Sequence, residues 1–373
     1  MAKVLSLVSY KIFPPKLGGQ KGIALFNQFF SPYHQVICVT TKNNDPGFAK
    51  NYKLLNILSN SKFRYINIFY FFTLQKIIKQ NNITHLLIEH PYYGWLGRLL
   101  QIFCKIKLIV HSHNIESLRF KSLNKWWWKI LWQYEKYVHR KADLTFCITE
   151  HDRQYMLSNF GLAPAKCIVI TYGIEWDHMP GAGEKEEAKK NLQTRYNFPG
   201  KTSIFLFNGT LSYPPNYDAV RFICDKLNPL LLQNDFDYKI IICGKDLPQA
   251  FNELRSYADK NIIYAGFVDD ISEYFKGADV FINPVFEGGG IKTKLVEALG
   301  YNLNAVSATN GATGVDEKIC NGKLFLADNA EQFAALMIKA ASSIPEVPSI
   351  YFDHFYWGNI AKKAASAMDD LIS

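Results

Sequence analysis

The sequence predicts an α/β protein made of two doubly wound domains. In both halves of the 373-residue chain, short apolar runs of strand length alternate with segments of helical periodicity. Such alternation is typical of a parallel sheet covered by helices on both sides. The chain is too long for one ordinary core, and a polar stretch interrupts the pattern near its middle. We expect two similar domains whose strands point their carboxyl ends into a cleft, where ligands of such sheets bind.

The first domain is expected over residues 1–175. Its strand-length apolar runs are VLSLVSY, VICVTT, LLIEH, LIVHSHN, LTFCITE and IVITYGIE, and its helical stretches are 22–30, 73–80 and 92–103. The segment that follows, DHMPGAGEKEEAKKNL, is polar and contains glycine. Residues 176–200 are therefore expected to form a linker.

The second domain is expected over residues 201–345, where the same alternation returns. Its strand-length runs are SIFLFNGTL, KIIICGKD, IIYAGFVDD, VFINPVF, NAVSAT and KLFLAD. Helical stretches are expected from Tyr217 to about Leu232 and over 330–343. Residues 346–373 end in a further helical pattern, which in such a layout crosses back to brace the first domain.

The composition indicates a globular, cytoplasmic protein. Hydrophobic residues make up 48% of the chain and charged residues 20%. The seven cysteines are scattered, without a CxxC pair or metal-like spacing, so they are expected to be reduced. No small-residue cleavage site follows the first apolar run, and no stretch approaches the roughly 20 apolar residues of a membrane span.

The basic charge is concentrated in the first half of the chain. Residues 1–180 contain 23 Lys and Arg against 9 Asp and Glu, a net charge of +14, whereas the remainder carries −5. This asymmetry predicts an acidic partner for the first half. A nucleic acid is disfavoured because the sequence has no basic helix of a DNA-reading type and no RNP-like motif. A peripheral contact with an anionic membrane at the inner face fits better.

The segment 125–141 supports the membrane hypothesis, since it interleaves tryptophan and tyrosine with lysine and arginine. The alternative is that Trp127, Ile130, Leu131 and Tyr134, which recur at helical spacing, face the core. The two interpretations are compatible, because the remaining tryptophans need another environment.

The stretch FINPVFEGGGIKTKLVEAL, residues 281–299, carries the most functional information. A strand, a glycine turn and a helix in succession present free backbone N–H groups to an anion. Lys292 and Lys294 fall at the start of the helix, where a cation is disfavoured unless it meets an anion. Glu297 follows one turn later, and its carboxylate can accept hydrogen bonds from a vicinal diol such as ribose. The alternative is an ordinary turn with solvated lysines.

Taken together, these motifs resemble the GT-B glycosyltransferases, specifically the retaining family 4 type (group 1), which have two Rossmann-like domains and use nucleotide-sugar donors. Nine matching segments occur in the expected order over nearly the whole chain. They are PPKLGGQ, EHPYYG, HSHNIE, ITEHD, ITYGIE, FNGTLSYPPN, IICGKD, GFVDDISEYFKGADVFINP and GGGIKTKLVEAL.

The resemblance implies roles for five residues of the first domain. Gly18 and Gly19 would let a loop approach the donor without a Cβ in the way, and His113 would lie beside the sugar as a catalytic group. Glu116 and Arg119 would lie on the acceptor side. The alternatives are a plain turn, a structural histidine and a surface ion pair.

In the second domain, the resemblance implies a donor site and leaving-group stabilisation as the chemistry. Lys294 would meet the diphosphate as a catalytic group, and Glu297 would bind the ribose. Glu287 is the third expected catalytic residue. The other expected donor-binding residues are Gly209, Gly244, Lys245, Phe267, Val268, Gly289, Gly290, Ile291 and Lys292. No metal and no cofactor beyond the nucleotide-sugar co-substrate is expected.

Two features depart from the family pattern. Nine residues separate Glu287 from Glu297, where the family motif has seven, and strict alignment puts Gly289 at the sugar-contacting position. Either Glu287 or backbone amides would then contact the sugar. Thr210 occupies a position where many relatives have arginine, which leaves the phosphate charge to Lys294, with Lys245 or Lys292 assisting.

The expected function is transfer of a sugar from a UDP- or GDP-sugar to an acceptor hydroxyl, in the synthesis of a cell-surface glycan or glycolipid. Two alternatives share the fold: a nucleotide-sugar epimerase, and a non-catalytic nucleotide- or glycan-binding partner.

Overall fold

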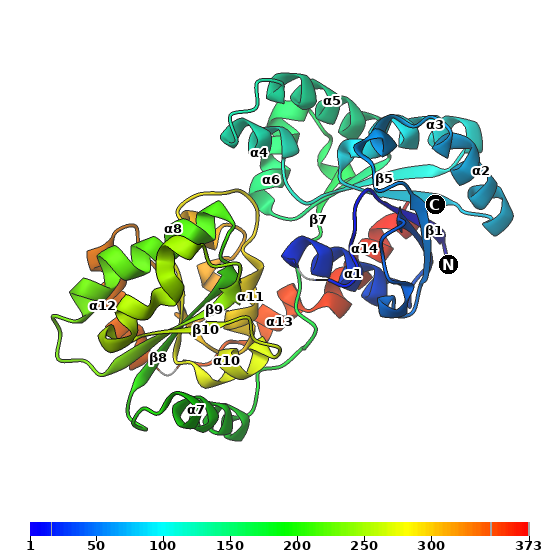
Figure 1. Cartoon of the computed structure of the whole chain (residues 1–373). Coiled ribbons are helices and arrows are strands. Elements are labelled where there is room, and N and C mark those ends of the chain that lie inside the picture. Colours follow the sequence, from blue (N-terminus) through cyan, green and yellow to red (C-terminus); the bar gives the residue numbers. More distant parts are fainter. Residues whose placement is uncertain (16, 344, 372–373) are drawn as a thin grey trace. The chain divides into compact units, whose positions relative to one another are not determined.

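The computed structural model describes residues 1–15, 17–343 and 345–371. The chain divides into two compact units (Figure 1). Unit 1 comprises Met1–Glu175 together with the segment from Phe355 onward, and unit 2 comprises Trp176–His354.

Unit 1 is built on a seven-stranded sheet in which every neighbouring pair is parallel. The strand order is β3-β2-β1-β4-β5-β6-β7, so the order reverses between β1 and β4. The strands are β1 (Lys3–Val8), β2 (Gln35–Thr41), β3 (Lys53–Leu58), β4 (His85–Glu89), β5 (Lys107–Ser112), β6 (Leu144–Cys147) and β7 (Cys167–Val169). The edge strand β3, KLLNIL, is not among the predicted strands. Asn56 interrupts its apolar residues, most of which are only half-buried.

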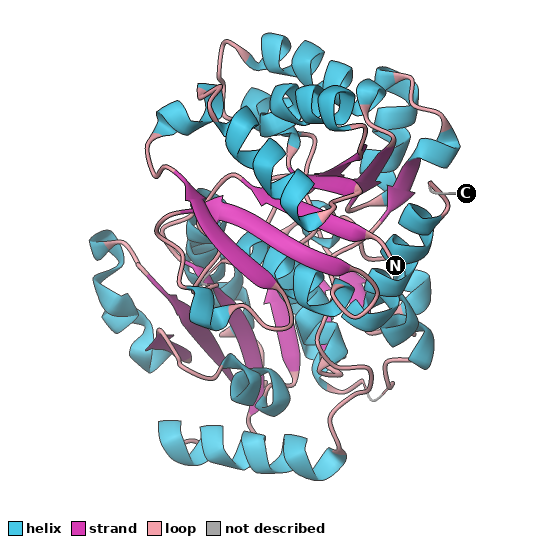
Figure 2. Cartoon of the chain, turned by 90° about the vertical axis from the view of Figure 1, so that its right-hand side faces the viewer, coloured by secondary structure: helices cyan, strands magenta, loops and turns pink. Residues whose placement is uncertain are grey.

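Helices cover both faces of this sheet (Figure 2). They are α1 (Gly18–Phe30), α2 (Tyr70–Asn81), α3 (Gly94–Cys104), α4 (Glu116–Ser122), α5 (Trp128–Lys141) and α6 (Glu150–Tyr155). Shorter helical turns are η1 (Pro46–Phe48), η2 (Lys62–Ile66), η3 (Pro91–Tyr93), η4 (Met156–Phe160) and η5 (Pro164–Lys166). One core cluster of unit 1 lies where buried strand residues such as Leu5, Leu86 and Val110 meet Leu74 and Leu96 of α2 and α3.

Unit 2 has a six-stranded parallel sheet of order β10-β9-β8-β11-β12-β13, which reverses between β8 and β11. The strands are β8 (Ser203–Thr210), β9 (Tyr238–Lys245), β10 (Ile262–Gly266), β11 (Val280–Asn283), β12 (Asn304–Ser307) and β13 (Leu324–Leu326). The helices are α7 (Ala182–Tyr196), α8 (Pro214–Phe222), α9 (Asn228–Leu231), α10 (Ile271–Gly277), α11 (Thr293–Gly300), α12 (Ala330–Ala341) and α13 (Ser349–Phe355), with turns η6 (Ile223–Leu227), η7 (Gln249–Lys260), η8 (Asn310–Ala312) and η9 (Glu317–Ile319).

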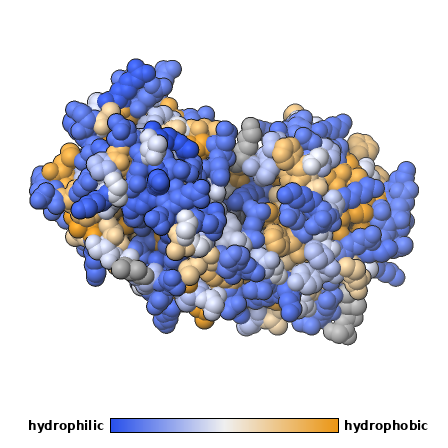
Figure 3. Space-filling model, turned by 90° about the horizontal axis from the view of Figure 1, so that it is seen from below, coloured by the Kyte–Doolittle hydropathy of each residue, from blue (hydrophilic) through white to orange (hydrophobic). Residues whose placement is uncertain are grey.

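Helix α7 occupies most of the stretch 176–200, where the sequence predicts a linker. It packs against α10 by burying Ala188 and Leu192, which are one helical turn apart. Ion pairs from Lys189 to Asp279 (2.7 Å) and from Lys276 to Glu184 (2.8 Å) add to this contact. The rest of the helix is polar, and hydrophilic side chains predominate over the surface that it forms (Figure 3).

The final helix, α14 (Trp357–Asp369), belongs to unit 1. It lies against α1, where Trp357 contacts the Phe26 ring at a centroid distance of 6.4 Å. Just before it, the backbone N–H of Ile174 donates to the Phe355 carbonyl (2.7 Å) and the N–H of Trp357 donates to the Ile174 carbonyl (2.9 Å).

The predicted α/β class, with two doubly wound parallel sheets, is confirmed. All seven cysteines are free thiols. Among the residues that the structure describes, no helix is both long enough and apolar enough to cross a bilayer.

Candidate active site

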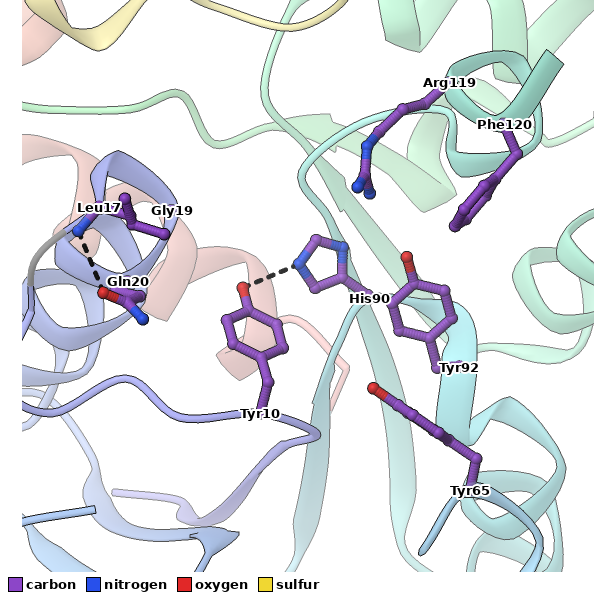
Figure 4. Close-up of a pocket in the computed structure, with 9 residues that line it drawn as sticks. All are labelled: Tyr10, Leu17, Gly19, Gln20, Tyr65, His90, Tyr92, Arg119 and Phe120. Atoms are coloured by element: carbon purple, nitrogen blue, oxygen red, sulfur yellow. Dashed lines mark hydrogen bonds between the residues drawn. The ribbon is translucent and has the colours of Figure 1, made fainter. Parts of the chain in front are cut away.

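A pocket of about 510 Å³ opens in unit 1 where the strand order reverses (Figure 4). Ligands of open α/β sheets bind at such a switch point, outside the carboxyl ends of the strands. Tyr10 follows β1 and His90 follows β4, so the two flanking strands each contribute a side chain. The lining residues are Tyr10, Leu17, Gly19, Gln20, Tyr65, His90, Tyr92, Arg119 and Phe120.

His90 connects the pocket to a buried carboxylate. Its Nδ1 lies 3.1 Å from Oε1 of Glu116, and its Nε2 lies 3.1 Å from the hydroxyl of Tyr10. An ionised carboxylate only accepts hydrogen bonds, so Nδ1 carries the proton and Nε2 accepts from the tyrosine. His90 has φ +66° and ψ 157°, a conformation that is normally restricted to glycine. Strain of this kind persists where surrounding contacts impose it, which marks His90 as a candidate functional residue.

Glu116 is fully buried and ionised. Its carboxylate also accepts from the Tyr92 hydroxyl (2.6 Å) and from Nη1 of Arg119 (2.7 Å). Burial would raise the pKa of this carboxyl group, but the hydrogen bond and charge of His90 and the charge of Arg119 lower it to about 2. The ion pair therefore orients the Arg119 guanidinium, which Figure 4 shows pointing into the space beside His90. Glu116 and Arg119 are not a simple surface ion pair, because Glu116 has no exposed surface.

His113 is paired with a second buried carboxylate, Glu89. The His113 Nε2 to Glu89 Oε2 distance is 2.6 Å, and Nδ1 of His111 lies 3.1 Å from the same oxygen. Burial tends to raise the pKa of Glu89, but His111 and His113 together hold it well below its usual range. Burial and the neighbouring His111 lower the pKa of His113. His113 is therefore a neutral imidazole that donates through Nε2 and leaves Nδ1 as an acceptor.

Glu89, His111 and His113 could also be considered as metal ligands, since their ligand atoms lie within 4.8 Å of one another. Ligand atoms bound at 2.0–2.1 Å around a tetrahedral zinc ion are about 3.3 Å apart. The 2.6 Å contact between Glu89 and His113 is shorter and has the length of a charge-assisted hydrogen bond. The geometry fits a shared proton better than a bound cation, and we assign no metal to this group.

The predicted residues of the first domain lie around this pocket. Gly19 and Arg119 line it, and Gly18 and Gly19 begin α1. The ring of His113 lies tilted against that of His90, with a centroid distance of 4.6 Å. Within unit 1, the structure thus brings together the glycine turn, His113 and the Glu116–Arg119 pair.

In unit 2, the glycine turn predicted from the sequence lies between β11 and α11, beside the switch point of that sheet. Gly288 and Gly290 have φ values of +94° and +73°, which favour glycine. A Cβ at Gly288 would lie 3.6 Å from Pro215, so this turn approaches the start of α8. The Nδ2 of Asn310 donates to the Gly288 carbonyl (3.1 Å) and ties the turn to η8.

Lys292 holds this turn in shape. Its ammonium group donates to the carbonyl oxygens of Gly288 (2.8 Å), Gly289 (3.1 Å) and Gly290 (3.1 Å). Burial lowers its pKa to about 8. The sequence predicts that Lys292 contacts the donor, whereas the structure directs its amino group to its own loop. By engaging the carbonyl oxygens, Lys292 leaves the backbone N–H side of the turn for an anion.

The other predicted glycines of unit 2 lie at the ends of β8 and β9. Gly209 and Gly244 are paired across these strands, and a Cβ at Gly244 would come within 2.0 Å of the Gly209 carbonyl oxygen. A side chain at Gly244 would therefore collide with β8, and a Cβ at Gly209 would come within 2.6 Å of Asn216 Nδ2, so packing alone requires glycine at both positions. Lys245 ends β9 next to Thr210, with its Nζ 3.7 Å from an Asp246 carboxylate oxygen.

The remaining predicted donor residues fall on neighbouring segments. Lys294 and Glu297 lie on α11. Burial raises the pKa of the Cys243 thiol in β9 to about 12, and the positive charge of Lys294 opposes this shift. Glu287 is exposed and precedes the glycines, and Ile291 follows them. Phe267 and Val268 follow β10, and the Phe267 side chain is 71% exposed. Unit 2 therefore gathers the predicted residues at the carboxyl edge of its sheet.

Sequence reasoning assigned no role to Glu89, His90, Tyr10 or Tyr92. The segment EHPYYG matches a family motif, but the motif alone gives no role to these side chains. Glu89 lies directly opposite His111 in the register of β4 and β5. The sequence does place Glu89 and His111 at the carboxyl ends of two predicted strands, which is a signal for a site. Only the strand order shows that these two strands are neighbours.

Comparison with known protein families identifies the chain. A family model described as glycosyl transferases group 1 matches residues 202–343, and one described as Glycosyltransferase Family 4 matches residues 25–178. The chain belongs to the group 1 glycosyltransferases. It is therefore a transferase enzyme, and the family that the motifs resemble is confirmed.

Relatives and solved structures agree with this assignment. The glycosyltransferase is 24% identical over 296 residues to an uncharacterised protein in the cps region of Klebsiella pneumoniae, with 76% of this chain and 71% of the relative covered. It is 28% identical over 142 residues to the O-antigen biosynthesis glycosyltransferase WbnH of Escherichia coli, covering 37% of this chain and 38% of WbnH. Anabaena HepE, solved with UDP, superposes with a TM-score of 0.74 at 14% identity, covering 99% of this chain and 100% of HepE. The fold of this glycosyltransferase is GT-B.

Proposed function

We propose that the enzyme transfers a hexose-type sugar from a UDP- or GDP-sugar to an acceptor hydroxyl with retention of the anomeric configuration. The observation that carries this proposal is the glycine turn of unit 2, which Lys292 braces at the N-terminus of α11. Free N–H groups at a helix N-terminus bind phosphate. Retention is supported by the resemblance to family 4 enzymes, and a nucleotide donor by the same motifs and by the UDP complex of HepE.

The chemistry required is stabilisation of the departing nucleoside diphosphate. Negative charge builds on its phosphate oxygens as the glycosidic bond breaks, and preorganised N–H donors with an ammonium group can stabilise it by several kcal/mol. We assign this task to the amides of residues 289–292 and to Lys294. These groups supply the positive potential that a divalent cation would otherwise provide, which supports metal-independent transfer. Glu297, one turn after Lys294, is assigned to the ribose hydroxyls.

The pocket of unit 1 is proposed as the acceptor site. Its walls include four aromatic rings, which suit the apolar faces of a sugar, and its hydroxyl and guanidinium groups suit sugar hydroxyls. His113, neutral and oriented by Glu89, offers Nδ1 as an acceptor for a sugar hydroxyl. The name of WbnH supports a role in surface polysaccharide synthesis, and a lipid-linked glycan is the acceptor class that we propose.

Calorimetry with UDP, GDP and ADP, followed by transfer assays with the matching sugar donors, tests this function. We expect one nucleotide to bind to the wild type and to bind at least about tenfold more weakly to Glu297→Ala. Proton NMR of the product should show the anomeric configuration of the donor. A sugar epimer formed from the donor without acceptor, or no nucleotide binding at all, would contradict the proposal.

A further inference from the structure

Exposed apolar side chains gather on one part of unit 1. They come from η2, from the start of α2 and from the end of α3, and we call them the apolar face. Its main members are Phe63, Ile66, Phe69, Phe72, Ile102 and Phe103, each of which is between 51% and 77% exposed. Half-buried Phe71 contacts the rings of both Phe72 (5.4 Å) and Phe103 (5.6 Å), so the members on α2 and α3 form a continuous surface. The two helices lie side by side in Figure 1. Extended exposed apolar surfaces mark interaction sites.

The chain segment that carries the apolar face is strongly basic. Residues 46–142, which include all of η2, α2, α3, α4 and α5, contain 16 Lys and Arg but three acidic residues. Those three are Glu89, Glu116 and Glu135, with exposures of 1%, 0% and 0%. Every carboxylate of this stretch is therefore inside the protein, and its outer surface carries cations without compensating anions. Such a surface is complementary to a strongly anionic partner.

The apolar face is continuous with the rim of the pocket. Residue Tyr65 of η2 lines the pocket, while its neighbours Phe63 and Ile66 in the same short helix point to solvent. On another side of the pocket, Phe120 is followed by Leu123 and Trp126, which are 51% and 83% exposed. A molecule seated on this surface therefore reaches the pocket through η2.

We propose that the apolar face, with the lysines around it, docks on an anionic lipid bilayer. Phenylalanine and isoleucine insert into the boundary between headgroups and acyl chains, while lysines bind lipid phosphates. The face presents the pocket to a lipid-linked acceptor, and in that respect the inference rests on the proposed function.

The apolar face is not the segment 125–141, which the sequence favours as the membrane contact. Trp132 donates to the Tyr155 hydroxyl (2.9 Å), and the Trp127 ring contacts that of Phe120 at a centroid distance of 4.6 Å. Both are partly buried by these contacts, and Trp126 is the tryptophan of this segment with a largely exposed ring. Packing within unit 1 therefore accounts for most of the tryptophan cluster, and the lipid contact moves to η2, α2 and α3.

Vesicle flotation with the full chain tests the inference. The protein should float with vesicles of phosphatidylcholine and phosphatidylglycerol and stay at the bottom with phosphatidylcholine alone. Phe69→Ser/Phe103→Ser should lower the bound fraction at least about tenfold, because two aromatic side chains that enter the bilayer on binding are lost. Lys62→Gln/Lys105→Gln should have a similar effect on the anionic vesicles. All of these positions are exposed, so the melting temperature should not change.

Matched controls separate this surface from charge or apolarity in general. Leu232→Ser/Ile350→Ser removes exposed apolar side chains from unit 2, and Lys362→Gln/Lys363→Gln removes exposed lysines from α14. Both controls should float like the wild type. Wild-type protein that fails to float, or variants that float equally, would overturn the inference. A dimer that Phe69→Ser/Phe103→Ser dissociates would instead assign the face to a second copy. Flotation needs neither donor nor acceptor, so its failure leaves the proposed transfer reaction intact.

Discussion

At the residue scale, the role proposed for His113 depends on the buried carboxylate of Glu89. Glu89 is 1% exposed and bonds Nε2 of His113, which fixes both the ring orientation and the protonated nitrogen. A histidine held in this way presents the same acceptor atom, Nδ1, in every catalytic cycle. Glu89 is therefore a positioning residue.

Replacing Glu89 tests this arrangement. We expect Glu89→Gln to lower kcat by at least about tenfold, because an amide can bond either nitrogen and no longer selects one tautomer. The affinity for the nucleotide should stay unchanged, since Glu89 lies in unit 1 and the glycine turn proposed to bind the nucleotide lies in unit 2. Steady-state kinetics and calorimetry measure the two effects. Glu150→Gln, at an exposed carboxylate of α6, is the control and should retain wild-type kinetics.

The lowered pKa of Glu116 predicts that this residue stabilises the fold in a pH-dependent way. Its folded pKa of about 2 lies below the value of an unfolded glutamate, so its contribution is complete above the unfolded pKa and is lost as the pH falls through the folded one. A shift of this size corresponds to roughly 3 kcal/mol. Urea unfolding of the wild type and Glu116→Gln should differ most at pH 6, and the difference should shrink towards pH 3. A difference that does not vary with pH would show that the ion pair is not the cause.

At the element scale, the shape of the glycine turn of unit 2 depends on Lys292. Its amino group satisfies three successive glycine carbonyls, so a flexible segment is fixed by one side chain. The flanking positive φ values of Gly288 and Gly290 show why larger residues would not replace the glycines. Preorganisation of this kind lowers the entropy that binding would otherwise cost.

Removing the amino group should loosen the turn. We expect Lys292→Met to weaken nucleotide binding about tenfold, because charged hydrogen bonds contribute roughly 1.5–3 kcal/mol and order the binding groups. Calorimetry measures the affinity, and limited proteolysis should show new cleavage near residues 287–292. Lys190→Met, on the exposed side of α7, is the matched control. Unchanged affinity in Lys292→Met would place the diphosphate elsewhere.

The elements also show how far the sequence can be interpreted. Long apolar strands and the glycine turn were predictable, because apolar runs and glycines leave a strong local signal. Helix α7 could not be predicted from the apolar pattern, because only two of its residues, Ala188 and Leu192, are buried, and the rest of the helix is polar. The site was predictable where one short segment carries it, as in 287–297. The Glu89–His113 pair was hidden because it depends on the register between β4 and β5, and the direction of the Lys292 side chain follows from tertiary structure alone.

At the scale of the whole molecule, unit 1 is assembled from both ends of the chain. The α14 helix buries Trp357, Ile360, Ala361, Ala364 and Met368. Trp357 meets Phe26 of α1 and also Tyr172, with centroid distances of 6.4 and 5.6 Å. Removal of the Trp357 side chain should therefore lower the stability of unit 1 and leave that of unit 2 unchanged.

Substitution of Trp357 measures this contribution. We expect Trp357→Ala to destabilise unit 1 by about 3–5 kcal/mol, the usual cost of truncating a large buried aromatic side chain. Hydrogen exchange followed by mass spectrometry should show faster exchange in β1, α1 and α14 and unchanged exchange in β8 and β9. Ile350→Ala, at a side chain that is 53% exposed in α13, should leave both units unchanged. Equal loss of protection in the two units would mean that they unfold together.

The contribution of α14 to unit 1 also sets an order of events during synthesis. A ribosome completes every residue of unit 2 before it makes α14, so unit 2 can close around its own core while unit 1 still lacks its last helix. Until then, the face of α1 that α14 covers stays open to chaperones or to other nascent chains. The domain that is translated first is therefore the one that finishes folding last.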